Sequence, residues 1–300
     1  MCPVEFAAGR FLRRLMKTQF LVLAIQLLLA ISNGADIVAP QVALPPGLEV
    51  PQCAGNVLAA QVGADHNCAA PDHQPRQFQH YSLCFRQSYK DAEWSAYCLR
   101  DVMLQKSVGR TNDFRPDPQI IGGSATLADY KKSGWDRGHL TPAGDMVFSR
   151  EAMSETFYMS NMTPQAPDFN RGIWKHLEDQ VREWAERFGR AYVASGPVLD
   201  KSADEYPSIG QSKVAVPEYF YKVILVPIYQ DDADKASPET CASVMAIGFI
   251  IPNKKCQDDF WNYAASVDQV EAATGLDFYP LLDDALEAAV EAESDIAPWR

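Results

Sequence analysis

Hydrophobic positions along this 300-residue chain follow a helical period in one segment and an extended period in several others. Between residues 172 and 189 the large apolar side chains return every three or four positions, which is the spacing of one buried helix face. These side chains are Trp174, Leu177, Val181, Trp184 and Phe188. The pattern predicts an amphipathic helix that ends at Gly189. We expect Trp135, Trp174 and Trp184 to lie in the core rather than to stack on bases.

Runs of strand length, rich in aromatic and β-branched residues, flank this helix. Residues 80–89 and 93–104 are separated by a short polar turn and predict a hairpin, whereas the Pro- and Gly-containing segment 110–134 predicts a loop. The other predicted core strands are residues 191–199, 219–229 and 243–253. Because strands both precede and follow the helix, their order favours an α+β domain over a doubly wound parallel fold.

The first 35 residues differ in composition from the rest. Basic residues precede the apolar run Phe20–Ile31, which is shorter than the roughly 18 residues that a membrane span requires. The pattern predicts a signal peptide over residues 1–34, cleaved near Gly34–Ala35, and therefore a secreted or periplasmic protein. Met16 is a second candidate for the initiator. Residues 35–77 lack periodicity and predict an N-terminal arm, followed by the main domain at 78–300.

Cysteine usage agrees with export. One of the seven cysteines lies in the leader, and the remaining six are an even set suited to disulfides in an oxidising compartment. Six cysteines allow 15 connectivities, and we favour the three sequence-local pairs. These pairs are Cys53–Cys68, Cys84–Cys98 and Cys241–Cys256. A zinc cluster is disfavoured because no C-x-x-C spacing is present.

The formal net charge of −12 is unusual for a protein that handles nucleic acid, because binding of the phosphate backbone depends on Lys and Arg. The acidity is concentrated at the C-terminus, where no Lys or Arg lies between Cys256 and Trp299. In this acidic tail the segment LLDDALEAAVEAE predicts a helix with Leu282 and Leu286 on one side and solvated carboxylates around them. The charge distribution therefore does not exclude a nucleic-acid substrate.

The segment WDRGHLTPAGDM, residues 135–146, concentrates ionisable groups. Asp136 and Arg137 are followed by His139, which can take a proton from water near neutral pH. An arginine can hold phosphate oxygens through its planar fork of donors. The combination indicates phosphoryl-group chemistry.

A second polar group of residues surrounds the start of the predicted helix. Asn170 lies at or just before the first turn, Glu178 lies two turns further, and Arg182 follows Glu178 at i+4. An amide oxygen and a carboxylate, with retained waters, are typical of a magnesium site. Asn161 and Gln165 precede these residues in the same segment.

The two motifs in this order resemble the DNA/RNA non-specific endonucleases of the ββα-metal superfamily, which include secreted bacterial nucleases and mitochondrial endonuclease G. DRGH is followed about twenty residues later by SNMTPQAPDFNRGIWKHLEDQ, and the resemblance covers roughly residues 79–286. It extends to YKKSGWDRGH, VASGPVL, VPEYFYKVIL and IIPNKK. The resemblance implies a central antiparallel sheet flanked by helices, stapled here by disulfides.

The resemblance also implies a role for each site residue. His139 matches the general base, Asn170 the one direct protein ligand of Mg²⁺, and Glu178 the carboxylate that holds the metal's waters. The remaining expected residues are the phosphate-contacting Arg137 and Arg182, the more loosely matched Arg110, the orienting acid Asp136, and the site-shaping, substrate-binding Asn161 and Gln165.

The sequence thus predicts a Mg²⁺-dependent endonuclease, with Mn²⁺ as a substitute ion, that hydrolyses DNA and RNA through contacts to the phosphate backbone. The resemblance implies 5′-phosphate products. Three alternatives stay open: a catalytically silent nucleic-acid-binding or uptake protein, an organellar nuclease with residues 1–35 as a transit segment, and a metallo-phosphatase for small esters. A homodimer, an inhibitor protein and the preference between DNA and RNA are also left open.

Overall fold

The computed structural model describes residues 41–44, 46, 48, 52–53, 68, 71–230 and 240–300. All of these except Gln41 belong to one compact unit, Val42–Arg300. The expected signal peptide and cleavage site lie outside the described residues, as does most of the expected N-terminal arm. Within the described ranges, every helix is too short or too polar to cross a bilayer.

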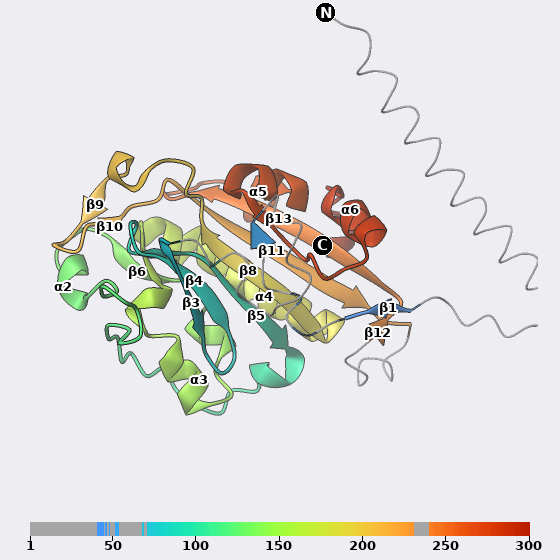
Figure 1. The fold of residues 1–300 in the computed structure, drawn as a ribbon. Coiled ribbons are helices and arrows are strands. Elements are labelled where there is room, and N and C mark those ends of the chain that lie inside the picture. Colours follow the sequence, from blue (N-terminus) through green and yellow to red (C-terminus); the bar gives the residue numbers. More distant parts are fainter. Residues whose placement is uncertain are drawn as a thin grey trace, which may run out of the picture. The chain divides into compact units, whose positions relative to one another are not determined.

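A seven-stranded antiparallel sheet, with strand order β14-β13-β11-β8-β5-β4-β3, forms the centre of this unit (Figure 1). Its strands are β3 (His73–Gln77), β4 (Ser82–Arg86), β5 (Asp91–Arg100), β8 (Arg190–Pro197), β11 (Tyr219–Ile228), β13 (Ser243–Pro252) and β14 (Ala264–Ala265). The predicted hairpin is β4–β5, and the predicted core strands are β8, β11 and β13. The expected α+β class and the central antiparallel sheet are confirmed.

The period-two alternation of side chains divides the core into two layers. On β11, Phe220 and Ile224 face the layer that contains α4 (Lys175–Phe188). Tyr221 and Val223 face the layer that contains α5 (Val267–Thr274) and α6 (Asp284–Glu291). Figure 1 shows α5 and α6 over β13. The sheet is therefore buried on both faces, which explains the nearly continuous apolar runs of its central strands.

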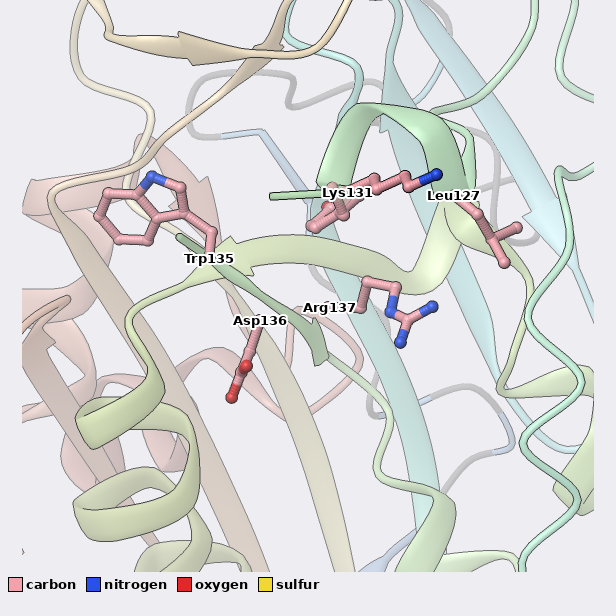
Figure 2. A pocket seen from close by; sticks show the side chains of 6 residues that line it. Leu127, Lys131, Trp135, Asp136 and Arg137 are labelled. Carbon is pink, nitrogen blue, oxygen red and sulfur yellow. The ribbon is translucent and has the colours of Figure 1, made fainter. Parts of the chain in front are cut away.

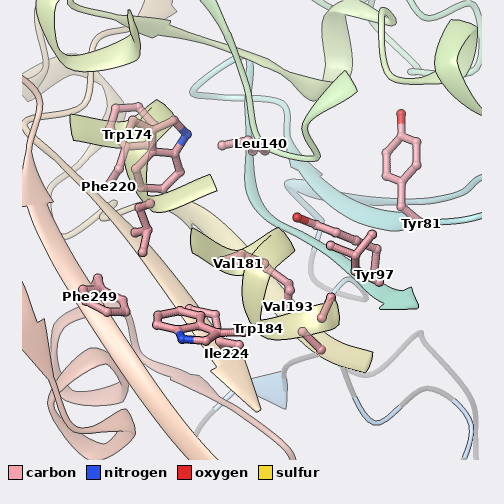
Figure 3. Packing of buried hydrophobic residues seen from close by; sticks show 14 of the residues in the cluster. Tyr81, Tyr97, Leu140, Trp174, Val181, Trp184, Val193, Phe220, Ile224 and Phe249 are labelled. Carbon is pink, nitrogen blue, oxygen red and sulfur yellow. The ribbon is translucent and has the colours of Figure 1, made fainter. Parts of the chain in front are cut away.

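Helix α4 forms where the helical period predicts it. Leu177, Val181 and Trp184 are buried against the sheet, and Figure 3 shows Val181 and Trp184 close to Val193 and Ile224. Gly189 ends the helix in the left-handed region at φ +80°, which glycine adopts without steric cost. A π-helical turn, Phe169–Trp174, precedes α4 and occupies the first positions of the predicted helix.

Shorter elements complete the unit. They are α2 (Leu127–Tyr130), α3 (Arg150–Glu155), and the paired strands β6 (Asp136–His139) with β7 (Met162–Gln165), β9 (Ser208–Ile209) with β10 (Val214–Ala215), β1 (Val42–Ala43) with β12 (Thr240–Cys241), and β2 (Gln52–Cys53) with β15 (Leu276–Asp277). The segment predicted as a loop over 110–134 contains α2. Residues 101–189, with both sequence motifs, lie between β5 and β8, which are neighbours in the sheet.

The predicted cysteine pairing is wrong. Cys68 is bonded to Cys84, with their Cα atoms 5.6 Å apart, so neither Cys53–Cys68 nor Cys84–Cys98 forms. The strand register explains this, because Cys84 lies opposite Trp94 and Cys98 is four residues, or about 13 Å, further along β5. Cys241 and Cys256 are not bonded to each other either, since the whole of β13 extends between them.

We expect Cys68→Ser to lower the free energy of unfolding by about 3 kcal/mol, because the bond closes a loop with a sequence separation of 16. Denaturant unfolding would measure this, with Cys256→Ser as a control that changes stability little. Peptide mapping without reduction should recover Cys68 linked to Cys84. Recovery of Cys84 linked to Cys98 would contradict the structure.

Candidate active site

The first motif lies on the two-stranded ribbon β6–β7. Gly138 pairs with Thr163, and His139 pairs with Met162. A Cβ added at Gly138 would lie 2.1 Å from Cδ of Gln165, so the side chain of Gln165 occupies the space that any larger residue would need. The glycine of DRGH is therefore required by close packing across the ribbon.

One pocket of about 320 Å³ collects most of the predicted site. It is lined by Arg110, Arg137, His139, Pro142, Ala143, Gly144, Asn170, Arg171, Lys175, Glu178 and Arg182. We call it the catalytic pocket. It contains both the candidate base and the candidate oxygen ligands, which come from β6, the π-helical turn and α4. Asp136, Asn161 and Gln165 do not line it.

His139 is buried, with 8% of its surface exposed. Its Nε2 atom is enclosed and has no hydrogen-bond partner in the described part of the chain. Burial, followed by the nearby Arg110 and Arg137, lowers the pKa of His139 to about 3. The imidazole is therefore neutral at physiological pH, which is the form that can accept a proton.

Two aromatic rings hold the cations that flank His139. The guanidinium of Arg137 lies 4.0 Å from the ring centroid of Phe114, and that of Arg110 lies 4.8 Å from the centroid of Phe157. Both rings also contact His139 edge-on, at centroid distances of 5.9 and 5.0 Å. Such stacking orients a guanidinium while leaving N–H donors for an anion.

Asp136 connects the two sequence motifs. Its carboxylate accepts hydrogen bonds from Nδ2 of Asn170 at 3.0 Å and from Nε and Nη2 of Arg171 at 2.7 and 2.6 Å. These bonds lower the pKa of Asp136 although burial alone would raise it. Because a carboxylate only accepts, the amide nitrogen of Asn170 must face Asp136, and its Oδ1 makes no hydrogen bond within the described residues.

Glu178 interacts electrostatically with a buried lysine, Lys222, which the sequence interpretation did not include. Lys222, in the middle of β11, has no exposed surface, and its Nζ lies 4.6 Å from the ring centroid of Trp174 with no hydrogen-bond partner among the described residues. Burial raises the pKa of Glu178, and Lys222 opposes this shift. Burial likewise lowers the pKa of Lys222, opposed by Glu178 and Asp145. The lysine therefore favours the ionised form of Glu178.

Arg182 is fixed by two carboxylates. Its Nη1 donates to Asp145 at 2.6 Å and its Nη2 to Asp179. Asp145 is fully buried and also accepts a hydrogen bond from Tyr97 Oη at 2.6 Å. Burial alone would lower the pKa of Arg182, but Asp145 raises it further, so the guanidinium stays charged. Its direction in the pocket is therefore set by β5 and the segment after β6.

Asn161 and Gln165 lie behind the pocket rather than in it, and both are fully buried. Asn161 accepts from the N–H of Thr141 and donates to the carbonyls of Thr141 and Thr156, each at 2.9 Å. It therefore fixes the backbone that follows His139. Gln165 packs against Gly138, as described above. The substrate contact expected of these two residues is not present in this arrangement.

Figure 2 shows a second pocket, of about 340 Å³, which is lined by Leu127, Tyr130, Lys131, Trp135, Asp136 and Arg137. We call it the Trp135 pocket. It shares Arg137 with the catalytic pocket. Trp135 is half-buried, whereas Trp174 and Trp184 belong to the core as expected. Trp135 thus packs on the core with part of its ring and faces the pocket with the rest.

Four residues of this region were missed from sequence: Arg171, Lys175, Asp145 and Lys222. The only visible signal for Lys222 was a single lysine inside a ten-residue apolar strand. Arg171 and Lys175 stand next to the predicted ligands, but a pattern does not show which side of a helical turn faces the pocket. Asp145 follows DRGH by six residues, and its role depends on the buried contact to Tyr97.

Comparisons with known proteins agree with this geometry. The model of the family described as DNA/RNA non-specific endonuclease matches residues 60–285. Nuclease EXOG, mitochondrial, of Mus musculus is 35% identical over 224 residues, which cover 70% of this chain and 58% of that protein. Nuclease 1, mitochondrial, of Schizosaccharomyces pombe is 37% identical over 213 residues, covering 66% and 63%. The chain spans less than two thirds of the length of these relatives.

Among solved structures, a crystal structure of an EndoG/EndoGI complex is similar with a TM-score of 0.62 and 29% identity. The match covers 71% of this chain and 88% of that chain. It confirms the ββα-metal nuclease fold that the motifs predicted.

The expectation of a secreted or periplasmic protein is wrong. The mouse and fission-yeast relatives are named as mitochondrial nucleases, which points to the mitochondrion rather than to export. The error came from two weak signals. A basic, apolar leader also suits organellar targeting, and the even cysteine count overstated the disulfides, since the described residues contain one.

We expect Gly138→Ala to destabilise the protein by about 1–3 kcal/mol, because the new methyl group would overlap the side chain of Gln165. Adding Gln165→Ala should restore part of this loss. Denaturant unfolding would measure both, with Gly109→Ala as the control, since nothing lies within 4 Å of a Cβ at that position. Equal stability of wild type and Gly138→Ala would refute the packing argument.

Proposed function

The chain belongs to the DNA/RNA non-specific endonuclease family, and on this premise we propose that it is a metal-dependent endonuclease that hydrolyses phosphodiester bonds of DNA and RNA. The observation that carries the proposal is the catalytic pocket itself. A neutral buried histidine, four arginines and two oxygen ligands face one space of about 320 Å³. Arginines and metal-binding oxygens are groups that act on phosphate, so the chemistry is directed to the backbone.

The residues present fit a hard divalent ion. Asp136 holds the Nδ2 end of the Asn170 amide, and the Oδ1 of this amide accepts no hydrogen bond from a described residue. The carboxylate of Glu178 accepts no hydrogen bond from a described residue, and Lys222 partly offsets the rise in its pKa that burial causes. We infer that Asn170 binds Mg²⁺ directly and that Glu178 holds its water ligands, with Mn²⁺ as a substitute. When bound, the ion supplies positive charge at the phosphoryl and leaving oxygens.

We assign the general base to His139. Because Nε2 is enclosed, Nδ1 is the nitrogen that would take a proton from the attacking water. Burial is the main cause of the low pKa of His139, and the nearby Arg110 and Arg137 lower it further. A phosphate bound to these arginines neutralises them and therefore raises the pKa of His139 towards the range useful for a base.

Three of the four arginines supply the remaining charge stabilisation. Arg137 and Arg110 would bind the non-bridging oxygens from the two sides of His139, where their aromatic partners hold them. Arg182 would contribute from α4, directed by Asp145. Attack by the activated water displaces the 3′ oxygen and leaves a 5′-phosphate product.

We further propose that the strand continues from the catalytic pocket across Arg137 into the Trp135 pocket. Alternation along an extended strand directs Trp135, Arg137 and His139 to the same side. In Figure 2 Lys131 and Arg137 place cationic groups over the pocket, opposite the indole of Trp135. A base stacked on Trp135, with its phosphate near Lys131, matches this chemistry and requires an unpaired nucleotide. Single strands would therefore be preferred.

The relatives' names lead us to propose that the nuclease acts in the mitochondrion, with the N-terminal segment as a transit sequence. An inhibitor protein is a reasonable partner, because the similar solved structure is an EndoG/EndoGI complex. Imaging of a C-terminally tagged full chain would test the location, and loss of mitochondrial signal on deletion of residues 1–35 is the expected result.

We expect His139→Ala and Asn170→Ala each to lower kcat/KM on plasmid DNA and on RNA by a factor of about 100 or more. The exposed substitutions His176→Ala and Asn262→Ala are matched controls that should retain activity. Chelation with EDTA should abolish cleavage, and Mg²⁺ should restore it. Wild-type rates in either pocket variant would refute the mechanism, and an inactive wild type with bound DNA would favour the silent binding protein.

We expect Trp135→Ala to raise KM for a single-stranded oligonucleotide about tenfold with little change in kcat, because one stacked base contributes about 1–3 kcal/mol. Trp135→Phe should restore most of the affinity, and duplex of the same sequence should be less affected. Lys131→Gln should weaken binding more than the neighbouring Lys132→Gln, since only Lys131 lines the pocket. Equal loss on single strand and duplex would mean that Trp135 has only a packing role.

A further inference from the structure

Five carboxylates meet on the face of the sheet that lies opposite α4. Asp268 and Glu271 come from α5, Asp277 from β15, and Glu287 and Glu291 from α6. They form two overlapping triads that share Glu291, and within each triad a carboxylate oxygen from every member lies within 4.8 Å of the others. We call this group the Glu291 cluster. Residues at i,i+3 on α5 and i,i+4 on α6 point to the same place.

The central member of the cluster is buried without a partner. Glu291 has 6% of its surface exposed, and its Oε1 atom is enclosed with no hydrogen bond to any described residue. Oε1 of Glu287 is likewise enclosed, with no hydrogen bond to any described residue. Among the described residues, the only hydrogen bond that a cluster member accepts is from the N–H of Phe278 to Glu271, at 2.8 Å. A buried, unsatisfied carboxylate is costly, so it must either take up a proton or be compensated by a positive partner.

The part of the chain that forms the cluster carries no basic residue. No Lys or Arg occurs between residues 257 and 299. Burial, and then the neighbouring carboxylates, raise the pKa of Glu291 to about 9 and those of Glu271 and Glu287 to about 7. The sequence interpretation of solvated carboxylates around α6 is therefore wrong for Glu291, although Leu282, Leu286 and Val290 pack inward as expected.

The donor set defines the kind of cation that fits. All five side chains offer oxygen, which selects hard ions over zinc or copper. Mg²⁺ usually takes one or two carboxylates and keeps several waters, whereas Ca²⁺ accepts many carboxylate oxygens in a flexible geometry. Each triad brings together three carboxylates from two elements, which is more than Mg²⁺ usually takes and matches the second case.

We propose that the Glu291 cluster is a structural calcium site, separate from the catalytic pocket. An ion held by the first triad would join α5 to α6, and one held by the second would join β15 to α6. Asp277 of β15 pairs with Gln52 of β2, so an ion in the second triad would also stabilise the attachment of the N-terminal arm. The site acts on stability and does not require the proposed nuclease activity.

The test is thermal unfolding of the full chain after removal of metal with a chelator, followed by titration with CaCl₂ or MgCl₂. Saturating Ca²⁺ should raise Tm by about 5 °C, as expected for a ligand far above its Kd that binds only the folded state, and Mg²⁺ should raise it less. Isothermal titration should give one Ca²⁺ per cluster. The absence of a Ca²⁺-dependent shift, or an equal shift with Mg²⁺, would overturn the proposal.

Three variants locate the effect. Glu291→Gln should abolish the Ca²⁺ shift and keep or raise the metal-free Tm, because a neutral amide of the same shape replaces a carboxyl group that is costly to ionise at this buried position. Glu293→Gln, at an exposed position two residues further on, and Asn170→Ala, in the catalytic pocket, should both retain the shift. A shift lost in Asn170→Ala but kept in Glu291→Gln would place calcium in the catalytic pocket. A metal-free Tm that rises on acidification, with no response to Ca²⁺, would show that protons neutralise the cluster instead.

Discussion

The carboxylate of Asp136 is the contact on which the candidate active site depends. It lies at the start of β6 and holds both Asn170 and Arg171 of the π-helical turn. The residues that would activate water and those that would bind the ion come from separate segments, and this carboxylate sets their relative position. It also decides which end of the Asn170 amide faces the pocket. Asp136 acts through Asn170 and Arg171 and is a positioning residue.

Charged side chains in and behind the wall of the pocket complete this arrangement. Two cations, Lys222 and Arg182, lie near two carboxylates, Glu178 and Asp145, and Tyr97 donates a hydrogen bond to Asp145 from the sheet. Removing a buried charge from such a set leaves its neighbours unpaired, so each member constrains the others. The chain can therefore be strongly acidic overall and still present arginines and a neutral histidine to an anionic substrate. Local pairing, rather than net charge, determines what the pocket binds.

The extent to which sequence predicts this molecule follows from the range of each interaction. Helix α4 and the strands were visible because their periods are local, and His139, Asn170 and Glu178 were visible because two motifs agreed in order. The disulfide was not, because its geometry depends on the register of β4 and β5. Asn161 and Gln165 were placed in the site because a polar residue near a motif gives no sign of the direction of its side chain. Lys222 and Glu291 required knowledge of which faces become buried.

Residues 101–189, which contain both sequence motifs, connect β5 to its neighbour β8, and this position has a further consequence. The seven strands follow each other in chain order across the sheet, and Arg100 and Arg190, at the two ends of the segment, are register partners. The segment thus begins and ends at one pair of register partners, and its two ends are separated by a single interstrand spacing of about 5 Å. Changes of length in the exposed loops of this segment can leave the strand register unaltered, because the two ends of the segment stay paired with each other. The sheet can therefore stay the same while the segment between β5 and β8 varies. Changes in substrate preference are expected to be located in that segment.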